Sequence, residues 1–127
     1  MSEPSTWRIL IVEDEPDGQE VAVGILGTMD IAADVAGTAE EALDMLEQQT
    51  YTAAVIDLAL PSMDGLTLMK TLRRNPATLN MPCMAYTAYH SSLVKKQALE
   101  AGCNAYLTKP IDDRHFLKEL SRIIAAG

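Results

Sequence analysis

The sequence has few cysteines and no long apolar segment. Cys83 and Cys103 are its two cysteines, and they lack the CxxC spacing of many metal and redox sites. Two cysteines cannot form a disulfide framework, so we expect free thiols in a reducing compartment. The segment Met1–Thr6 is polar and lacks the apolar centre of a signal peptide. No apolar run approaches the roughly 20 residues that span a bilayer. We therefore predict a cytoplasmic protein without a membrane segment.

Basic residues are in the minority. There are 10 Lys and Arg against 18 Asp and Glu, for a net charge of −8. Such an acidic chain is a poor candidate for binding nucleic acid or an anionic membrane directly. Apolar residues make up 48% and charged residues 22% of the chain, which favours a globular fold over disorder. The length of 127 residues suits one domain, so we predict a single domain over 1–127, with its core at about 7–124.

Short apolar runs alternate with segments of helical pattern. The runs do not alternate between polar and apolar residues, which favours strands buried on both faces, as in a parallel sheet. Four are clear and the fifth is weaker: Ile9–Val12, Ala53–Ile56, Cys83–Tyr86, Ala105–Leu107 and, as the weaker one, Ile31–Ala36.

The segments between the runs carry apolar residues at helical spacing and capping residues at their ends. Gly24 lowers the helix propensity of the first segment by about 1 kcal/mol relative to alanine. The predicted helix starts are Pro16, Thr38, Asp64–Gly65, Ser91 or Ser92, and Asp112–Asp113; the predicted ends are Gly27, Gly102 and the residues before Pro76.

Five strands alternating with five helices predict a doubly wound α/β fold. Ligands in such folds bind outside the carboxyl ends of the strands. Polar residues stand at four of the five predicted strand ends: Glu13-Asp14-Glu15, Asp57, Thr87 and Thr108-Lys109.

The chemistry of these residues suggests a phosphoryl site. Carboxylates of Glu13, Asp14 and Asp57 within a few Å of one another would repel unless protonated or bound to a metal. A hard cation, Mg²⁺ before Mn²⁺, would relieve this repulsion and leave positions for water or phosphate. Asp57 would then be the nucleophile, with Lys109 as a second positive charge and Thr87 as a hydroxyl donor.

Each residue also has an ordinary structural explanation. Acids favour helix N-termini, an aspartate after a strand is often a turn residue, and a threonine in a strand is often only a strand former. A lone lysine is usually solvated, and Tyr106 is more often a core residue than a moving part. One shared site explains the four polar positions together, whereas the structural explanation needs four separate coincidences.

The ordered set of motifs resembles the receiver domain of two-component response regulators, from about Trp7 to Ile124. Any one motif is weak, but the ordered set is highly specific. The motifs are Ile11–Glu15, Val55–Asp57 with Leu60–Gly65, Tyr86–Ala88, and Gly102–Pro110.

The resemblance implies a flavodoxin-like fold with strand order 2-1-3-4-5. Asp57 matches the phosphoryl acceptor and Asp14 the acid that binds Mg²⁺ directly. Glu13 matches the acid that acts through water, and the carbonyl of Ala59 matches a further metal ligand. Lys109 matches the lysine that pairs with the phosphoryl group, and its bond to Pro110 resembles the cis peptide of the family.

The resemblance also implies a switch. Thr87 matches the switch hydroxyl, and Tyr106 matches the aromatic that moves inward. Together they would change the surface of the fourth helix, fifth strand and fifth helix. The implied donor is a histidine kinase or a histidine phosphotransferase. The only catalysis implied is the chain's own phosphoryl transfer and autodephosphorylation, so we expect a signalling switch rather than an enzyme.

Two features depart from the common family pattern. Glu13 stands where aspartate is more frequent. Ala59 and Tyr89 occupy the two variable positions that flank the phosphoryl group, and neither is suited to orient an attacking water. We therefore expect a long-lived phospho-Asp57.

Three other functions fit the sequence less well. A haloacid-dehalogenase-type phosphatase would have an aspartate where Ala59 stands. A nucleotide or flavin module would need a loop that binds phosphate, and Glu13–Pro16 would repel phosphate. A receiver-like scaffold that takes no phosphate is disfavoured because every site position is filled.

The setting of the domain stays open. The chain could be a stand-alone regulator, a phosphorelay shuttle or a receiver excised from a larger regulator or hybrid histidine kinase. Met1 and the short C-terminal segment 125–127 favour the stand-alone form. The downstream target and phosphorylation-dependent dimerisation also stay open.

Overall fold

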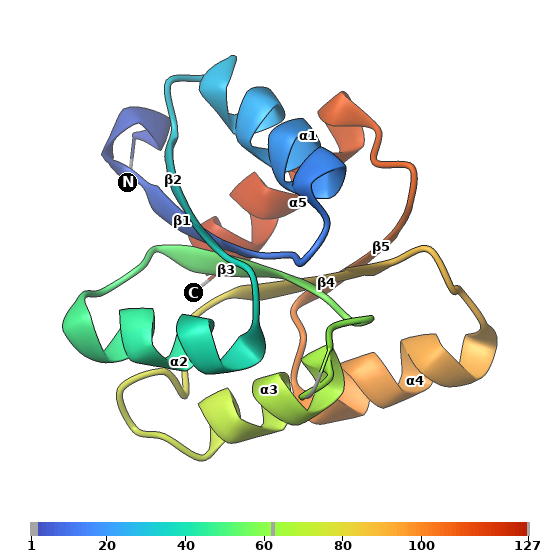
Figure 1. Ribbon diagram of the computed structural model, residues 1–127. Helices are drawn as coiled ribbons and strands as arrows, with labels where there is room; N and C mark the ends of the chain where they lie inside the picture. Colours follow the sequence, from blue (N-terminus) through green and yellow to red (C-terminus); the bar gives the residue numbers. More distant parts are fainter. Residues whose placement is uncertain (1–2, 62, 127) are drawn as a thin grey trace.

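The computed structural model describes residues 3–61 and 63–126. Five parallel strands form one sheet with helices on both faces (Figure 1). The strands are β1 (Arg8–Val12), β2 (Ala32–Ala36), β3 (Ala53–Asp57), β4 (Cys83–Thr87) and β5 (Ala105–Thr108). The helices are α1 (Pro16–Gly27), α2 (Ala39–Gln48), α3 (Gly65–Arg73), α4 (Ser92–Ala101) and α5 (Asp113–Ala126). A short 3-10 helix over Pro4–Thr6 precedes β1, and the sequence patterns did not predict it.

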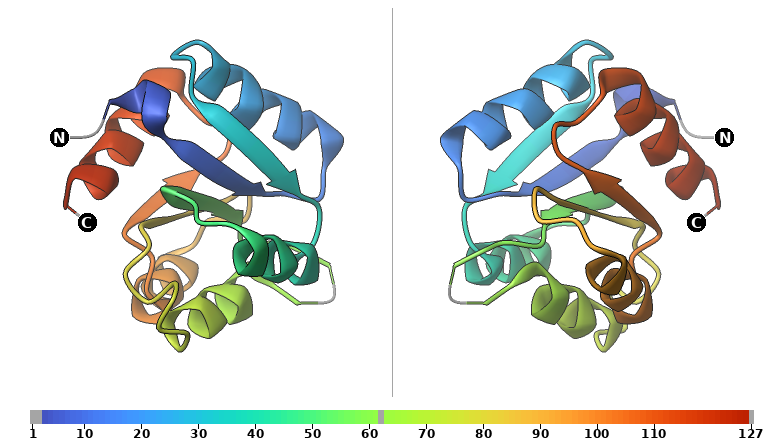
Figure 2. Two further views of the ribbon diagram at one scale, coloured as in Figure 1. Left: turned by 90° about the vertical axis from the view of Figure 1, so that its left-hand side faces the viewer. Right: turned by 90° about the vertical axis from the view of Figure 1, so that its right-hand side faces the viewer.

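The strand order is β2-β1-β3-β4-β5, which confirms the predicted doubly wound fold. Helices α1 and α5 cover one face, and α2, α3 and α4 cover the other (Figure 2). β3 and β4 are buried along their whole length because helices pack on both sides. This explains why these strands have unbroken apolar sequences.

Helix ends follow the predicted caps closely. The side chains of Thr38, Asp64 and Ser91 accept hydrogen bonds from the amides of the first turns of α2, α3 and α4. Gly102 ends α4 with φ of 113°, a left-handed conformation that favours glycine. Glu41 accepts a hydrogen bond from the Gly37 amide at 3.4 Å, one residue before the position that the capping box predicts.

Arg73, at the end of α3, connects several loops at the edge of the sheet where the strands begin. Its guanidinium donates hydrogen bonds to the carbonyls of Gly102 and Met81 at 2.8 Å, and to Asn104 Oδ1 at 2.9 Å. It also donates to the carbonyls of Thr78 and Leu79 at 3.1 Å. One side chain thus ties α3 to the α3–β4 loop and to the C-terminal end of α4.

The cysteines and the helix lengths bear on two predictions made from the sequence. Cys83 and Cys103 are buried free thiols, as predicted, and burial raises the pKa of each to about 11. Within 3–61 and 63–126, every helix is too short or too polar to traverse a bilayer.

Candidate functional site

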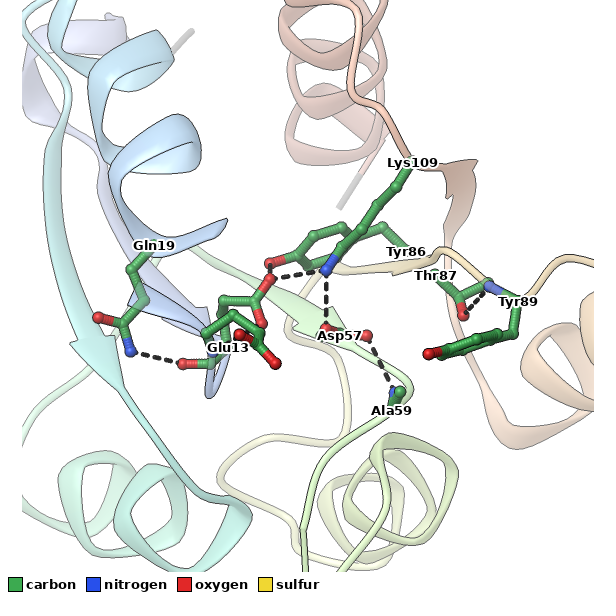
Figure 3. Close-up of polar contacts among 9 residues, drawn as sticks. Glu13, Gln19, Asp57, Ala59, Tyr86, Thr87, Tyr89 and Lys109 are labelled. Carbon is green, nitrogen blue, oxygen red and sulfur yellow. Dashed lines mark hydrogen bonds and ion pairs between the residues drawn. The ribbon is translucent and has the colours of Figure 1, made fainter. Parts of the chain in front are cut away.

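The predicted polar residues meet at the carboxyl edge of the sheet. Glu13 and Asp14 follow β1, Asp57 is the last residue of β3, and Lys109 follows β5. Figure 3 shows that the side chains of Glu13, Asp57 and Lys109 point toward one another although they come from three strands. Glu13 is fully buried and Asp57 is 3% exposed, whereas Asp14 lies nearer the surface. The topology therefore gathers two buried carboxylates and one more accessible carboxylate at one point.

Lys109 joins two of these carboxylates. Its Nζ lies 2.8 Å from Glu13 Oε1 and 2.9 Å from Asp57 Oδ2. The backbone amide of Ala59 donates to the other Asp57 oxygen, Oδ1, at 2.9 Å. Both oxygens of Asp57 are thus held by donors, which fixes the orientation of this carboxylate toward the cavity.

Burial raises the pKa of both carboxylates, but the net shifts of Glu13 and Asp57 are opposite. Burial by itself raises the pKa of Glu13, but Lys109, a backbone amide and Tyr86 stabilise its anion, and the net pKa lies below 4.5. Burial raises the pKa of Asp57 above 3.8, and the charge of Glu13 adds to this rise. Burial opposes the charge on Lys109, but the two carboxylates outweigh it and raise its pKa. A single lysine therefore leaves Asp57 less stable as an anion than a solvated carboxylate.

The acidic residues are close enough to share a cation. One oxygen from each of Glu13, Asp14 and Asp57 lies within 4.8 Å of the other two. Asp14, Asp57, Ala59, Tyr89 and Lys109 line a cavity of about 260 Å³. Oxygen donors around a small polar cavity suit a hard cation such as Mg²⁺. The raised pKa of Asp57 fits the same cation, because a nearby positive charge would stabilise its anion. The direct role of Asp14, the role of Glu13 through water and the carbonyl of Ala59 stay predictions.

The predicted switch residues, Thr87 and Tyr106, are not among the residues that line this cavity. Thr87 is the last residue of β4 and is 2% exposed, and its Oγ1 accepts a hydrogen bond from the Tyr89 amide at 3.0 Å. Tyr106 is half-buried on β5, and its hydroxyl lies 3.0 Å from His90 Nδ1. Tyr89 lines the cavity but is 75% exposed, so its ring covers the cavity only in part. The switching roles of Thr87 and Tyr106 stay predictions.

Sequence reasoning missed Tyr86 as a polar partner in the site. A tyrosine inside an apolar strand run is expected to be a core residue, and Tyr86 is indeed 1% exposed. Its hydroxyl nevertheless donates to Glu13 Oε1 at 2.9 Å (Figure 3). The one signal in the sequence was the departure at Glu13, because a glutamate carboxylate extends one methylene farther from the backbone than that of an aspartate.

The family is decided by comparison with known proteins. The family model of the response regulator receiver domain matches residues 9–121 of the sequence. The chain belongs to the response regulator receiver family. An uncharacterised 14.6 kDa protein of Leptolyngbya boryana is 36% identical over 110 residues, which cover 87% of this receiver and 84% of that protein. Two further relatives, a response regulator and a hybrid histidine kinase, are much longer, and the receiver covers only 24% and 9% of their lengths.

Solved receiver structures share the fold. A putative response regulator from Chloroflexus aurantiacus has a TM-score of 0.91 and 31% identity, over 94% of this receiver and 98% of that chain. The receiver domain of a sensor histidine kinase from Pseudomonas aeruginosa has a TM-score of 0.87 and 29% identity, again over 94% and 98%. That structure holds a magnesium ion coordinated in its active site cleft. The predicted resemblance to receiver domains is thereby confirmed at the level of family and fold.

Proposed function

We propose that this receiver takes a phosphoryl group onto Asp57 and signals through the surface formed by α4, β5 and α5. The observation that carries the proposal is the position of Lys109, whose Nζ joins Asp57 and Glu13 beside a cavity that Asp14 also lines. A carboxylate held by a lysine at an open cavity is suited to attack a phosphoryl donor and then to keep the charged product.

The transfer can be written from the residues of this chain. Oδ1 or Oδ2 of Asp57 attacks the phosphorus of a phosphohistidine, and the P–N bond breaks as the P–O bond forms. The electron pair of the P–N bond leaves with the imidazole nitrogen. Lys109 pairs with the transferred group, and the Thr87 hydroxyl donates to one of its oxygens. Bound by Asp14, Asp57 and the Ala59 carbonyl, with Glu13 acting through water, Mg²⁺ would supply positive charge against the phosphoryl oxygens.

The proposed change in the surface formed by α4, β5 and α5 begins with a movement of the Thr87 hydroxyl. When the Thr87 hydroxyl turns to the phosphoryl oxygen, it gives up its bond to the Tyr89 amide. Space beside Thr87 then changes, and Tyr106 packs inward and leaves His90. Phosphate shifts the population only by its differential stabilisation of this second shape.

The proposed setting is a cytoplasmic phosphoryl switch whose donor is a histidine kinase or a histidine phosphotransferase. A stand-alone regulator or a phosphorelay shuttle is proposed first, and a receiver excised from a longer regulator or hybrid kinase is the alternative. Beyond its own phosphoryl transfer and autodephosphorylation, no reaction on another substrate is proposed. Matches to proteins of similar length and to much longer ones support both settings.

Intact mass spectrometry tests the proposed transfer. Wild type and Asp57→Asn are incubated with acetyl phosphate, with and without Mg²⁺. A gain of about 80 Da, the mass of an added phosphoryl group, is expected only for wild type with Mg²⁺. A protein that gains no mass under any condition works without phosphate, and the proposal is then wrong.

A further inference from the structure

The Glu13 carboxylate lies in a closed recess beside the cavity, which Tyr86, Lys109 and Gly18 surround. Its carboxylate is fully buried, and three donors contact it: the Tyr86 hydroxyl at 2.9 Å, Lys109 Nζ at 2.8 Å and the Glu15 amide at 3.1 Å. The first two share Oε1, and the amide bonds to Oε2. Both oxygens are thus held within the protein, so this carboxylate is fixed rather than free to rotate.

Tyr86 contacts both partners of this ion pair. Its hydroxyl donates to Glu13, and its ring lies under the ammonium of Lys109, with Nζ 4.8 Å from the ring centroid. Figure 3 shows the ring beside Lys109, with the hydroxyl at the carboxylate. Because Tyr86 is 1% exposed and sits inside β4, its own position is set by core packing. The Tyr86 ring is therefore a rigid aromatic surface against which the ammonium group of the long Lys109 side chain packs.

Gly18, in the first turn of α1, makes room for the same carboxylate. A Cβ atom added at Gly18 would lie 2.7 Å from Glu13 Cδ and would collide with Oε1. Any larger residue at this position would push the carboxylate out of the recess. An aspartate in place of Glu13 is one methylene shorter and would not fill the recess. Glu13, Gly18 and Tyr86 are therefore matched to one another.

We propose that Tyr86 is a positioning residue that, through Glu13 and under Lys109, fixes the lysine against Asp57 for phosphoryl transfer. The proposal rests on the proposed function of Asp57. Lys109 Nζ stands between the two carboxylates, 2.9 Å from Asp57 Oδ2 and 2.8 Å from Glu13 Oε1. The Tyr86 hydroxyl selects which carboxylate oxygen faces the lysine. A small displacement of a charge that must meet the transferred group slows the reaction.

The first test is a double-mutant cycle on the rate of phosphorylation by acetyl phosphate at saturating Mg²⁺, followed by intact mass. Tyr86→Phe removes the hydroxyl and keeps the ring, and we expect the maximal rate to fall about tenfold. We expect the half-saturating acetyl phosphate concentration to stay within about twofold, because Tyr86 lies behind the lysine. In a Glu13→Asp background we expect the shorter carboxylate to lose its bond to the Tyr86 hydroxyl, so Tyr86→Phe should change the maximal rate less than about twofold.

Tyr51→Phe is the matched control. Tyr51 is also buried, at 6% exposure, and its hydroxyl also donates to a carboxylate, Asp34 Oδ2, at 2.6 Å. Tyr51→Phe is expected to lower stability and leave the rate at its wild-type value. Rates are compared per folded molecule, so a loss of folded protein in either variant does not affect the comparison.

The second test needs no phosphate. Gly18→Ala in wild type is expected to lower the folding equilibrium constant, measured by urea unfolding, about tenfold or more, because the new methyl group meets Glu13. In the Glu13→Asp background the same change should raise the constant about fivefold, since alanine has the higher helix propensity. Such a reversal between the two backgrounds would show that the new methyl group and the Glu13 carboxylate compete for the same space.

The outcomes separate the two proposals. Wild type that takes no phosphate overturns the proposed function, and the Gly18 cycle still decides whether the recess exists. Wild type that is phosphorylated, with Tyr86→Phe as fast as Tyr51→Phe, overturns the positioning role. An equal slowing by Tyr86→Phe in the Glu13→Asp background also overturns it, because the effect would then not pass through Glu13.

Discussion

Replacing Arg73 by methionine removes the guanidinium that ties three segments together and keeps most of the apolar stem. The guanidinium donates to five acceptor groups, of which four are backbone carbonyls. Truncating one hydrogen bond to a charged group costs about 1.5–3 kcal/mol, and such costs do not add when one donor group is shared. Water can reach the loop carbonyls after the change, so we expect a total loss of about 3 kcal/mol.

This loss is large on the scale of a small domain, whose unfolding free energy is about 5–15 kcal/mol. Near the midpoint, the entropy of unfolding is about 2.1 cal/mol/K per residue, which for 127 residues converts the loss into a drop of about 10 °C in Tm. Urea unfolding and thermal melting followed by circular dichroism measure both quantities.

Arg122→Met provides the control for this prediction. Arg122 also donates to a carboxylate and to a carbonyl, but its side chain is 54% exposed. We expect its replacement to cost less than about 1 kcal/mol, as is usual for an exposed ion pair. Similar losses for Arg73→Met and Arg122→Met would show that the loop carbonyls are solvated in the folded protein, and the reasoning about Arg73 would be refuted.

Three further predictions concern the site and the pH dependence of stability. Gly65→Ala should lower the unfolding free energy by about 1–3 kcal/mol and slow phosphorylation, because the new Cβ would lie 2.5 Å from the Asp57 carbonyl oxygen; unchanged urea midpoints would contradict this. Hydrogen bonds, the strongest of them from Arg8, lower the pKa of Asp34 below 3.8. The ionised form of Asp34 therefore stabilises the fold above pH 3.8, and this stabilisation is lost as the pH falls through the pKa of the folded state. Asp34→Asn should thus cost about 1 kcal/mol at pH 7 and much less in acid, and a pH-independent difference in urea unfolding would count against it. Phospho-Asp57 should persist beyond seconds in Mg²⁺ buffer and decay faster in Ala59→Asn, which offers an amide to orient water; decay of the wild type within seconds would disprove the first part.

The sequence predicted those parts of the fold that depend on local pattern. Buried strands read as apolar runs, and Thr38 and Gly102 are caps whose hydrogen bonds lie within four residues along the chain. Gathering the site residues needed only the rule that parallel strands end at one edge. Asp57, predicted to end the third strand, is the last residue of β3.

Contacts between distant residues were not accessible in this way. Tyr86 meets Glu13 across 73 positions of the chain, and Arg73 meets Asn104 across 31. Nothing in the local pattern of an apolar strand or an amphipathic helix shows which distant group a hydroxyl or guanidinium will reach. The first of these contacts holds Glu13 within the site, and the second connects α3 to the segment before β5.

The anchoring of α4 at one end also sets how that helix can move. Its C-terminal end is held through the Gly102 carbonyl by Arg73, while its N-terminal end begins just after Tyr89 and His90, beside the site. A helix of 10 residues is about 15 Å long, so a rotation about Gly102 would act over an arm of that length. A rotation of about 10° would carry the N-terminal end through about 2.5 Å, at the 1.5 Å rise per residue of an α-helix, while Gly102 stays in place. In such a rotation the displacement would grow steadily along α4, and residues near Ser92 would move farthest.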